Sequence, residues 1–278
     1  MILLQHNNTN EIDSRKTNMK SLFASTSLVA AVLALTPNLA SAQAKTEQAK
    51  SPWTMTGNMT FASEYRYRGI SQTNSKPALQ GGFDWAHEQG YYFGTWASNV
   101  SWLSDAGQSN SLEWDFYGGY KGVAAGLNYD VGALYYWYPG TYTAGQTSPS
   151  TLEIYAALTW TQYTLKYSHS LTNTFGFADS KSSGYLDATG NFELGGGINL
   201  VAHLGRQMIT SSSGNNRSNS DCTYADWKLG VTKDMVGFTF GVAYVDTNAK
   251  GNVGQCYRNS LDKNLGKSTL VLSATKNF

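Results

Sequence analysis

The sequence predicts an all-β protein, a transmembrane antiparallel β-barrel of about twelve strands with short turns at one end and long loops at the other. Three observations predict this fold: long stretches in which apolar and polar residues alternate, connections that alternate between short and long, and a chain rich in Tyr, Trp and Gly but poor in charge. A period of two places successive side chains on opposite faces of a strand. A strand that crosses a membrane needs about 9–11 residues, with apolar side chains toward lipid and polar ones toward the lumen.

The alternation is longest over Thr54–Gly69. One parity is apolar except for Ser63, and the other is polar except for Ala62. We therefore predict one long first strand over 54–69. Its outward residues are Met55, Gly57, Met59, Phe61, Tyr65 and Tyr67, and its inward charged residues are Glu64, Arg66 and Arg68.

Eleven further segments continue the pattern. The cleanest is Ser111–Tyr120, where Leu112, Trp114 and Phe116 alternate with Glu113 and Asp115. The faces of Tyr91–Val100 stay unassigned, because it is aromatic on both parities. The predicted strands are Pro77–Ala86, Tyr91–Val100, Ser111–Tyr120, Ala125–Tyr138, Leu152–Trp160, Tyr163–Leu171, Tyr185–Phe192, Ile198–Arg206, Tyr224–Lys233, Phe238–Tyr244 and Leu270–Phe278.

The connections between these strands alternate between long and short. The short ones lie near residues 87–90, 121–122, 161–162, 194–196 and 234–236. The long, polar ones cover 70–76, 101–110, 140–150, 172–183, 208–223 and 246–266. Short periplasmic turns and long extracellular loops are typical of bacterial outer-membrane barrels. A soluble β-sandwich could share the composition, but it has no reason to alternate its connections in this way.

The first 42 residues are predicted to be an N-terminal extension and a cleaved signal peptide, and residues 43–278 the barrel domain. Met19 and Lys20 open a short basic region, Leu22–Leu35 is apolar but too short to span a membrane, and Ala40-Ser41-Ala42 offers a cleavage site. We take Met19 as the true start. Removing residues 1–42 leaves 17 basic and 17 acidic residues, so the mature chain has no net charge to attract nucleic acid.

Cys222 and Cys256 are the only cysteines, and they fall in the two longest predicted loops. An exported chain crosses an oxidising compartment, which favours a disulfide between them. Two metal-binding thiolates are the alternative, but no His or other Cys lies near either one in the sequence.

Twelve charged residues share the inward parity, and we predict that they line the pore. They are Glu64, Arg66, Arg68, Asp84, Glu113, Asp115, Asp130, Glu153, Lys166, Asp187, Asp226 and Lys228. One interpretation is that they pair across a narrow lumen and hold the barrel's shape. The other is that they form a constriction that selects ions or solutes. Eight carboxylates against four Lys or Arg predict a mild cation preference.

No catalytic, cofactor-binding or metal-binding residues are predicted. His169 lies between Ser168 and Ser170, and in a strand neighbouring side chains point to opposite faces, so they cannot form a Ser/His pair. No zinc-ligand spacing, phosphate loop or dinucleotide motif appears.

Four other residues have predicted roles. Phe278 ends the chain on an aromatic residue, as an assembly signal would. Arg206 is placed to meet lipopolysaccharide phosphate, and Tyr136 and Tyr138 to stack on a sugar or aromatic solute.

Several motifs resemble the TorF family of predicted porins, a proteobacterial outer-membrane family formerly of unknown function. They are EYRYRGISQT at 64–73, KPALQG at 76–81, GTWASNV at 94–100, YDVGALYYWYPG at 129–140, DWKLGV at 226–231 and AYVDT at 243–247. Glu64 stands where the family commonly has Asp, and the loop around Cys256 is particular to this chain.

The resemblance implies an outer-membrane channel for passive diffusion of small hydrophilic solutes or ions. Its expected partners are outer-membrane lipid, lipopolysaccharide and the barrel-assembly machinery, with no cofactor. A plugged structural or adhesive barrel that acts through its loops is the first alternative, and an outer-membrane lipid hydrolase is the second.

Overall fold

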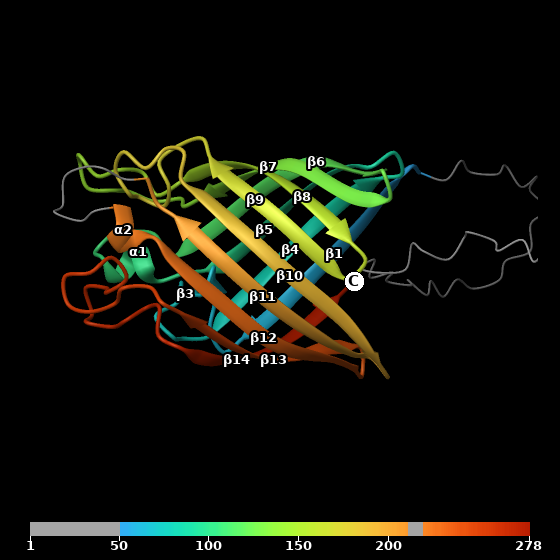
Figure 1. The fold of residues 1–278 in the computed structure, drawn as a ribbon. Helices are drawn as coiled ribbons and strands as arrows, with labels where there is room; N and C mark the ends of the chain where they lie inside the picture. The colour runs from blue at the N-terminus through green and yellow to red at the C-terminus, as the bar shows by residue number, and fades with distance from the viewer. Residues whose placement is uncertain (1–50, 211–218) are drawn as a thin grey trace, which may run out of the picture.

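The structure, a computed structural model, describes residues 51–210 and 219–278. Within these residues, twelve antiparallel strands close into a barrel in the order β1-β14-β13-β12-β11-β10-β9-β8-β7-β6-β5-β4 (Figure 1). The strands are β1 Trp53–Ala62, β4 Ala78–His87, β5 Tyr91–Asn99, β6 Leu112–Ala124, β7 Leu127–Trp137, β8 Thr151–Trp160, β9 Tyr163–Ser170, β10 Gly184–Gly195, β11 Ile198–Met208, β12 Tyr224–Met235, β13 Phe238–Thr247 and β14 Thr269–Asn277. The predicted fold class is confirmed.

The long and short connections lie at opposite ends of the barrel, as the sequence predicts (Figure 1). Two helices of four residues each, α1 Trp102–Asp105 and α2 Asn219–Cys222, belong to the long loops. The predicted signal peptide and the predicted start at Met19 lie outside the described residues. Among the described residues, no helix is both long and apolar enough to cross a membrane.

The two faces of the barrel wall differ as the alternation predicts. Phe61 of β1 pairs with Leu79 of β4 on the outer face, and each side chain is more than half exposed. The next pair along, Thr60 and Gln80, lies on the inner face. A belt of exposed apolar side chains this extensive needs a bilayer to cover it, so the outer face is that of a membrane barrel.

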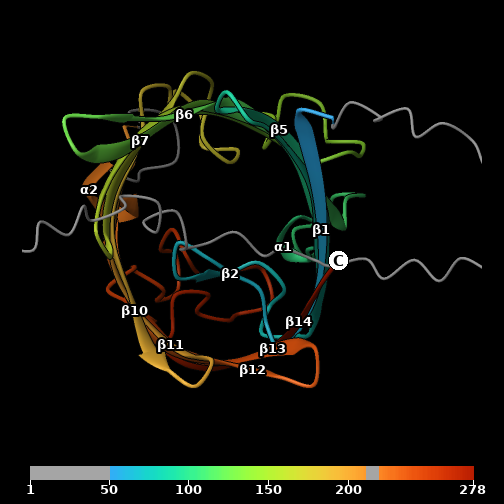
Figure 2. The same cartoon turned by 90° about the vertical axis from the view of Figure 1, so that its right-hand side faces the viewer.

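The first strand ends earlier than the sequence predicts. β1 stops at Ala62, and residues 63–77, here called the lumen hairpin, turn into the barrel. Within it, β2 Arg66–Tyr67 pairs with β3 Ile70–Ser71. Figure 2 looks along the barrel and shows β2 inside the ring of strands. The predicted lipid-facing positions of Tyr65 and Tyr67 are therefore wrong.

Two features mark the departure of the chain from the barrel wall. The Ser63 hydroxyl accepts a hydrogen bond from the Leu272 backbone N–H of β14 at 2.9 Å. This hydroxyl takes the position that the next backbone carbonyl of the strand ladder would have. Further on, Arg68 and Gly69 have φ of 46° and 78°, so both central residues of the turn are left-handed. This is the conformation of a tight two-residue hairpin turn.

A second predicted boundary is also wrong. β6 continues through Lys121 and Gly122, where the sequence predicts a turn. The chain reverses instead at Ala125 and Gly126, whose φ values of 50° and 79° again give a two-residue hairpin turn.

Clusters of buried apolar side chains lie inside the barrel, around the lumen hairpin. One contains Tyr65, Val100, Leu103, Tyr136 and Tyr138. The other contains Ile70, Tyr224 and Tyr257. The hairpin is thus the element against which the interior packs.

Candidate functional site inside the barrel lumen

The lumen hairpin leaves the wall at β1 and β4, its tip lies against β12 and β13, and the Arg68 side chain at the tip reaches across to β8. Its base joins β1 to β4, whereas Tyr224 at the start of β12 donates its hydroxyl to the Arg68 carbonyl at 2.9 Å. A Cβ on Gly69 would collide with Thr247 and Asp226, so the glycine lets the tip lie directly against β12 and β13. The hairpin therefore narrows the lumen across its width.

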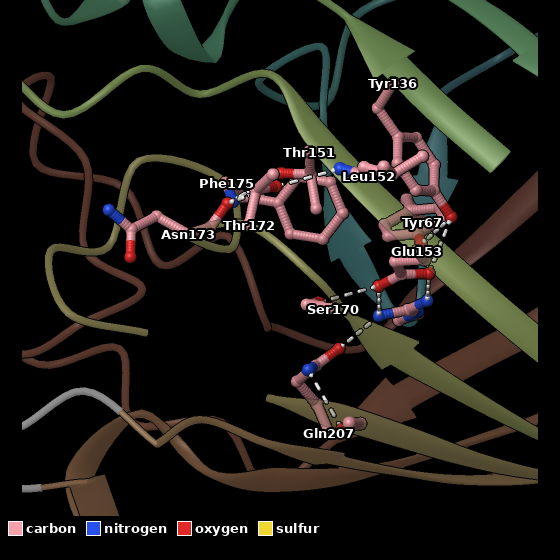
Figure 3. A network of polar contacts seen from close by, with 12 residues as sticks. Tyr67, Tyr136, Thr151, Leu152, Glu153, Ser170, Thr172, Asn173, Phe175 and Gln207 are labelled. Atoms are coloured by element: carbon pink, nitrogen blue, oxygen red, sulfur yellow. Dashed lines mark hydrogen bonds and ion pairs between the residues drawn. The ribbon is translucent and has the colours of Figure 1, made fainter. Parts of the chain in front are cut away.

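Arg68 fixes the tip of the hairpin. Its Nη1 and Nη2 donate to the two carboxylate oxygens of Glu153 on β8 at 3.1 and 2.7 Å, and Nη1 also donates to Gln207 of β11 at 2.7 Å. Figure 3 shows Ser170 and Tyr136 on other sides of the same carboxylate, at 3.4 and 3.2 Å. Such two-pronged pairs are among the stronger charge-assisted hydrogen bonds.

Aromatic rings surround the guanidinium. Its central carbon lies 4.8 Å from the Tyr67 ring centroid and 4.3 Å from that of Tyr185. Burial alone lowers the pKa of Arg68, but the neighbouring Tyr67 and Glu153 outweigh it, so the pKa ends well above its usual value. Arg68 thus keeps its charge in the lumen.

A second buried carboxylate, Glu113 of β6, is held by hydroxyls instead of a cation. It accepts the hydroxyls of Tyr65 and Tyr138, each at 2.8 Å. Burial and the nearby carboxylates raise the pKa of Tyr65 well above its usual value, so it remains a donor. Tyr136 and Tyr138 are 3% exposed, and their hydroxyls donate to carboxylates. The prediction that these two rings stack on a solute is therefore wrong.

The base of the hairpin carries an internal ion pair. Nε of Arg66 lies 2.9 Å from a carboxylate oxygen of Glu64. Nη1 of Arg66 also donates to the carbonyl of Leu265, in the loop before β14, at 2.8 Å. These two residues thus stabilise the hairpin and its contact with the last long loop.

His203 of β11 joins two of the predicted residues on the far wall. Its Nε2 lies 2.9 Å from Asp226 of β12, and its Nδ1 lies 3.4 Å from Asp187 of β10. Tyr185 donates to the same Asp226 carboxylate at 2.9 Å. Nothing local in the sequence marks His203 as a partner of Asp187 and Asp226.

The remaining predicted residues are spread along the inner wall. Asp84 accepts the Tyr117 hydroxyl at 2.6 Å, and Asp130 accepts that of Tyr92 at 2.5 Å. The Lys166 ammonium lies 3.9 Å from the Tyr155 ring centroid. The Lys228 ammonium forms no hydrogen bond or ion pair with any residue in the described part of the chain.

A cavity of about 560 Å³ opens in the lumen beside the hairpin. Glu64, Arg66, Asp115 and Lys228 are its charged lining residues. Tyr65, Trp96 and Tyr117 supply aromatic side chains on one side, and short aliphatic residues of β13 and β14 lie on the other. The aliphatic group includes Ala243, Val245 and Val271. The remaining predicted residues, such as Asp130 and Lys166, lie outside this cavity.

The disulfide between Cys222 and Cys256 is present, with their Cα atoms 5.4 Å apart, as the sequence predicts. It joins α2 to the last long loop. Tyr257 packs with Tyr224 of β12 and with Ile70 of the hairpin. Its hydroxyl donates a hydrogen bond to the Cys222 carbonyl. The disulfide thus holds the last long loop against the back of the hairpin.

Within the described residues, no group of three or more His, Cys, Asp or Glu side chains is arranged to hold a metal ion.

Tyr65, Tyr67 and Gln207 are site residues that sequence reasoning missed. The two tyrosines have the parity of a lipid-facing strand, and Gln207 carries no charge. The sequence does carry a signal that the strand ends. Ala62 and Ser63 break the alternation of polar and apolar residues, and a glycine follows Arg68.

Solved structures with a similar arrangement include outer-membrane proteins. The COG4313 outer membrane channel from Pseudomonas putida F1 is 12% identical, with 86% of this chain and 100% of that chain covered and a TM-score of 0.45. The NanC porin is 8% identical, with 80% and 98% covered and a TM-score of 0.46. OccAB3 from Acinetobacter baumannii is 9% identical, with 83% and 65% covered and a TM-score of 0.41. Likeness this distant says nothing about what this chain binds or transports.

No curated protein matches the sequence. A family model does match, over residues 46–278, and it describes a bacterial protein of unknown function. The name TorF is not part of that description, so the resemblance stays a prediction. The chain belongs to the Gcw_chp family.

Proposed function

We propose that this protein is an outer-membrane channel through which small hydrophilic solutes or ions diffuse passively. The observation that carries the proposal is a cavity of about 560 Å³, lined in part by four charged side chains, inside a closed barrel with an apolar outer face. The Lys228 ammonium lines this cavity and has no hydrogen-bond or ion-pair partner among residues 51–210 and 219–278, which suits contact with water and solutes. A charged residue whose role was only to stabilise the barrel wall would be expected to form an ion pair with another residue.

The lumen hairpin supports a second candidate, a plugged barrel that acts through its loops. Arg68 is held by four side chains of the opposite wall and of the hairpin itself, so the hairpin is firmly placed across the lumen. If the space beside it does not connect the two ends of the barrel, solutes cannot pass.

The location and partners belong to the same proposal. The long loops would face outward, and the short turns with the chain end would face the periplasm. Arg206, exposed on the outer face, would contact lipopolysaccharide. Phe278 would serve the barrel-assembly machinery.

Single-channel conductance in a planar bilayer tests the proposal. Three folded proteins are compared: the native chain, a variant with residues 65–74 replaced by a short Gly-Ser linker, and a control that lacks the exposed loop tip 143–146. We expect discrete steps from the native chain, larger steps from the linker variant and unchanged steps from the control. Conductance by the linker variant alone would identify a plugged barrel and refute the channel. Ester hydrolysis by the native chain in detergent would favour the lipid hydrolase.

A further inference from the structure

The inner wall of the barrel carries an apolar surface on the side formed by β11 to β14. Its side chains are Val201 of β11, Ala243 and Val245 of β13 and Val271 of β14, and all four line the cavity. They are neighbours in the sheet, because Ala243 pairs with Val271, and Val201 and Ala243 both pair with Gly230 of β12. The lumen side of a membrane barrel is ordinarily polar, so contact with water alone does not account for this aliphatic patch.

Lys228 lies at the edge of the aliphatic patch. Its direct neighbour on β13 is Val245, and Gly230 follows two residues later on the same face of β12. Neighbours across strands have Cβ atoms about 4.5–5.5 Å apart, so one small molecule can reach the ammonium and the patch together. The ammonium has no hydrogen-bond or ion-pair partner among residues 51–210 and 219–278.

The carboxylate next to Lys228 on its own strand is held by other residues. Asp226 lies two residues before Lys228 on the same face of β12. It accepts the Tyr185 hydroxyl at 2.9 Å and lies 2.9 Å from Nε2 of His203. Asp226 is therefore engaged away from the Lys228 ammonium.

The other charged residues that line the cavity do not neutralise Lys228 either. Glu64 and Arg66 pair with each other at 2.9 Å. Asp115 belongs to β6, on the opposite wall of the barrel, where burial beside Glu113 favours its neutral form. In the described part of the chain, the cavity thus presents an unpaired positive charge beside an aliphatic surface.

We propose that this cavity binds a short aliphatic monocarboxylate, with its carboxylate on the Lys228 ammonium and its alkyl chain on the aliphatic patch. One negative charge balances the charge of Lys228, and mostly apolar walls with a few placed polar groups are typical of small-molecule sites. The inference rests on the proposed channel function and deepens it by naming the solute class that the lumen retains.

Binding is measured by equilibrium dialysis of radiolabelled hexanoate against the refolded barrel in nonionic detergent, and detergent alone corrects for uptake by micelles. Hexanamide, which keeps the chain but lacks the charge, and acetate, which keeps the charge but lacks the chain, are tested as competitors. We expect saturable binding of hexanoate. Each competitor should bind about tenfold more weakly or worse, because hexanamide loses the ion pair and acetate loses the buried methylenes.

Variants locate the site. Lys228→Met should weaken hexanoate binding by about tenfold, and Lys228→Arg, which keeps the charge, should retain most of it. Val271→Thr should weaken binding several-fold, because it places a hydroxyl in the aliphatic patch at nearly constant shape. Lys121→Met is the matched control and should leave binding unchanged, since Lys121 lies outside the cavity and near Asp130. Heat-modifiable migration in a gel shows that each variant is folded.

Equal binding of hexanoate and hexanamide, no saturable binding to a folded barrel, or unchanged binding by Lys228→Met would overturn the proposal. Conductance of the same samples separates these outcomes from failure of the channel itself. A barrel that conducts but does not bind hexanoate refutes the site alone, and one that binds but does not conduct refutes the channel alone.

Discussion

At the scale of single residues, Arg68 does most to define the lumen. Its guanidinium links the hairpin to β8 and β11 through charge-assisted hydrogen bonds. Removing it leaves the Glu153 carboxylate, 1% exposed, without its cation. Loss of one partner of a buried pair is strongly destabilising because the other charge stays buried.

We expect Arg68→Ala to lower the free energy of unfolding by about 3–5 kcal/mol. Arg68→Lys should recover only part of it, since an ammonium cannot donate to both carboxylate oxygens in the same fixed geometry. Urea unfolding in detergent measures both. The double variant Arg68→Ala/Glu153→Gln should be more stable than Arg68→Ala. Arg206→Ala, at an exposed position, is the control. An equal loss of stability in Arg206→Ala would contradict the prediction that the buried Arg68–Glu153 pair is responsible.

Gly57 governs the closure of the barrel at the chain end. Its backbone exchanges two hydrogen bonds with Phe278, at 2.7 and 2.9 Å. A Cβ at Gly57 would lie 2.6 Å from the Phe278 ring, so a side chain there must displace it.

We therefore expect Gly57→Ala to destabilise the barrel by about 1–3 kcal/mol, the usual cost of overpacking. If the clash is the cause, Gly57→Ala should cost much less in a Phe278→Ala background. Unfolding of the four proteins in the same detergent gives this coupling. Additive losses would place the cause elsewhere.

At the scale of elements, the hairpin and the last long loop act together. Ile70 of β3 packs with Tyr224 and Tyr257, and the disulfide at Cys256 lies directly beside this cluster. Loss of the disulfide should therefore affect the lumen as well as the loop.

Reduction of the disulfide is expected to lower stability by about 3–4 kcal/mol in the chain-entropy treatment of a loop this long. It should also raise the conductance, because the hairpin loses support on its outer side. Single-channel recordings before and after adding reductant measure the effect. The variant Cys222→Ser/Cys256→Ser should not respond to reductant, and unchanged conductance in the native chain would show that the loop does not hold the hairpin.

At the scale of the whole molecule, the balance of unpaired charge sets ion preference. Arg68 and Arg66 are neutralised by Glu153 and Glu64. Asp84 and Asp130 instead receive tyrosine hydroxyls, with a Lys121 ammonium 4.0 Å from Asp130. Among the twelve charged residues predicted to line the pore, the eight carboxylates outnumber the four Lys or Arg.

A mild cation preference follows for the open channel. Reversal potentials across a salt gradient should show it, most clearly at low ionic strength, where charges are least screened. Asp84→Asn/Asp130→Asn should reduce the preference. Asp262→Asn, in an exposed loop pair with Arg258, should not. Anion selectivity of the native chain would contradict the prediction.

Most of the barrel could be predicted from the sequence because its signals are local. The alternation of apolar and polar residues in segments such as Ser111–Tyr120 predicts a strand with one face toward lipid and the other toward water. This prediction does not depend on which strand lies beside the segment. Long and short connections give the two ends in the same way. Two cysteines in long loops of a chain predicted to be exported were enough to predict their disulfide.

The hairpin could not be predicted in this way, because residues 64–68 keep the alternation of a strand after the strand has ended. The direction of that segment is decided by contacts between residues far apart in the chain. The Ser63 hydroxyl ends the ladder against Leu272, and Arg68 finds its carboxylate at Glu153 and its amide at Gln207. Sequence alone therefore determined the barrel and its two faces, and the tertiary structure decided what occupies the lumen, since long-range pairing of buried charges has no local pattern.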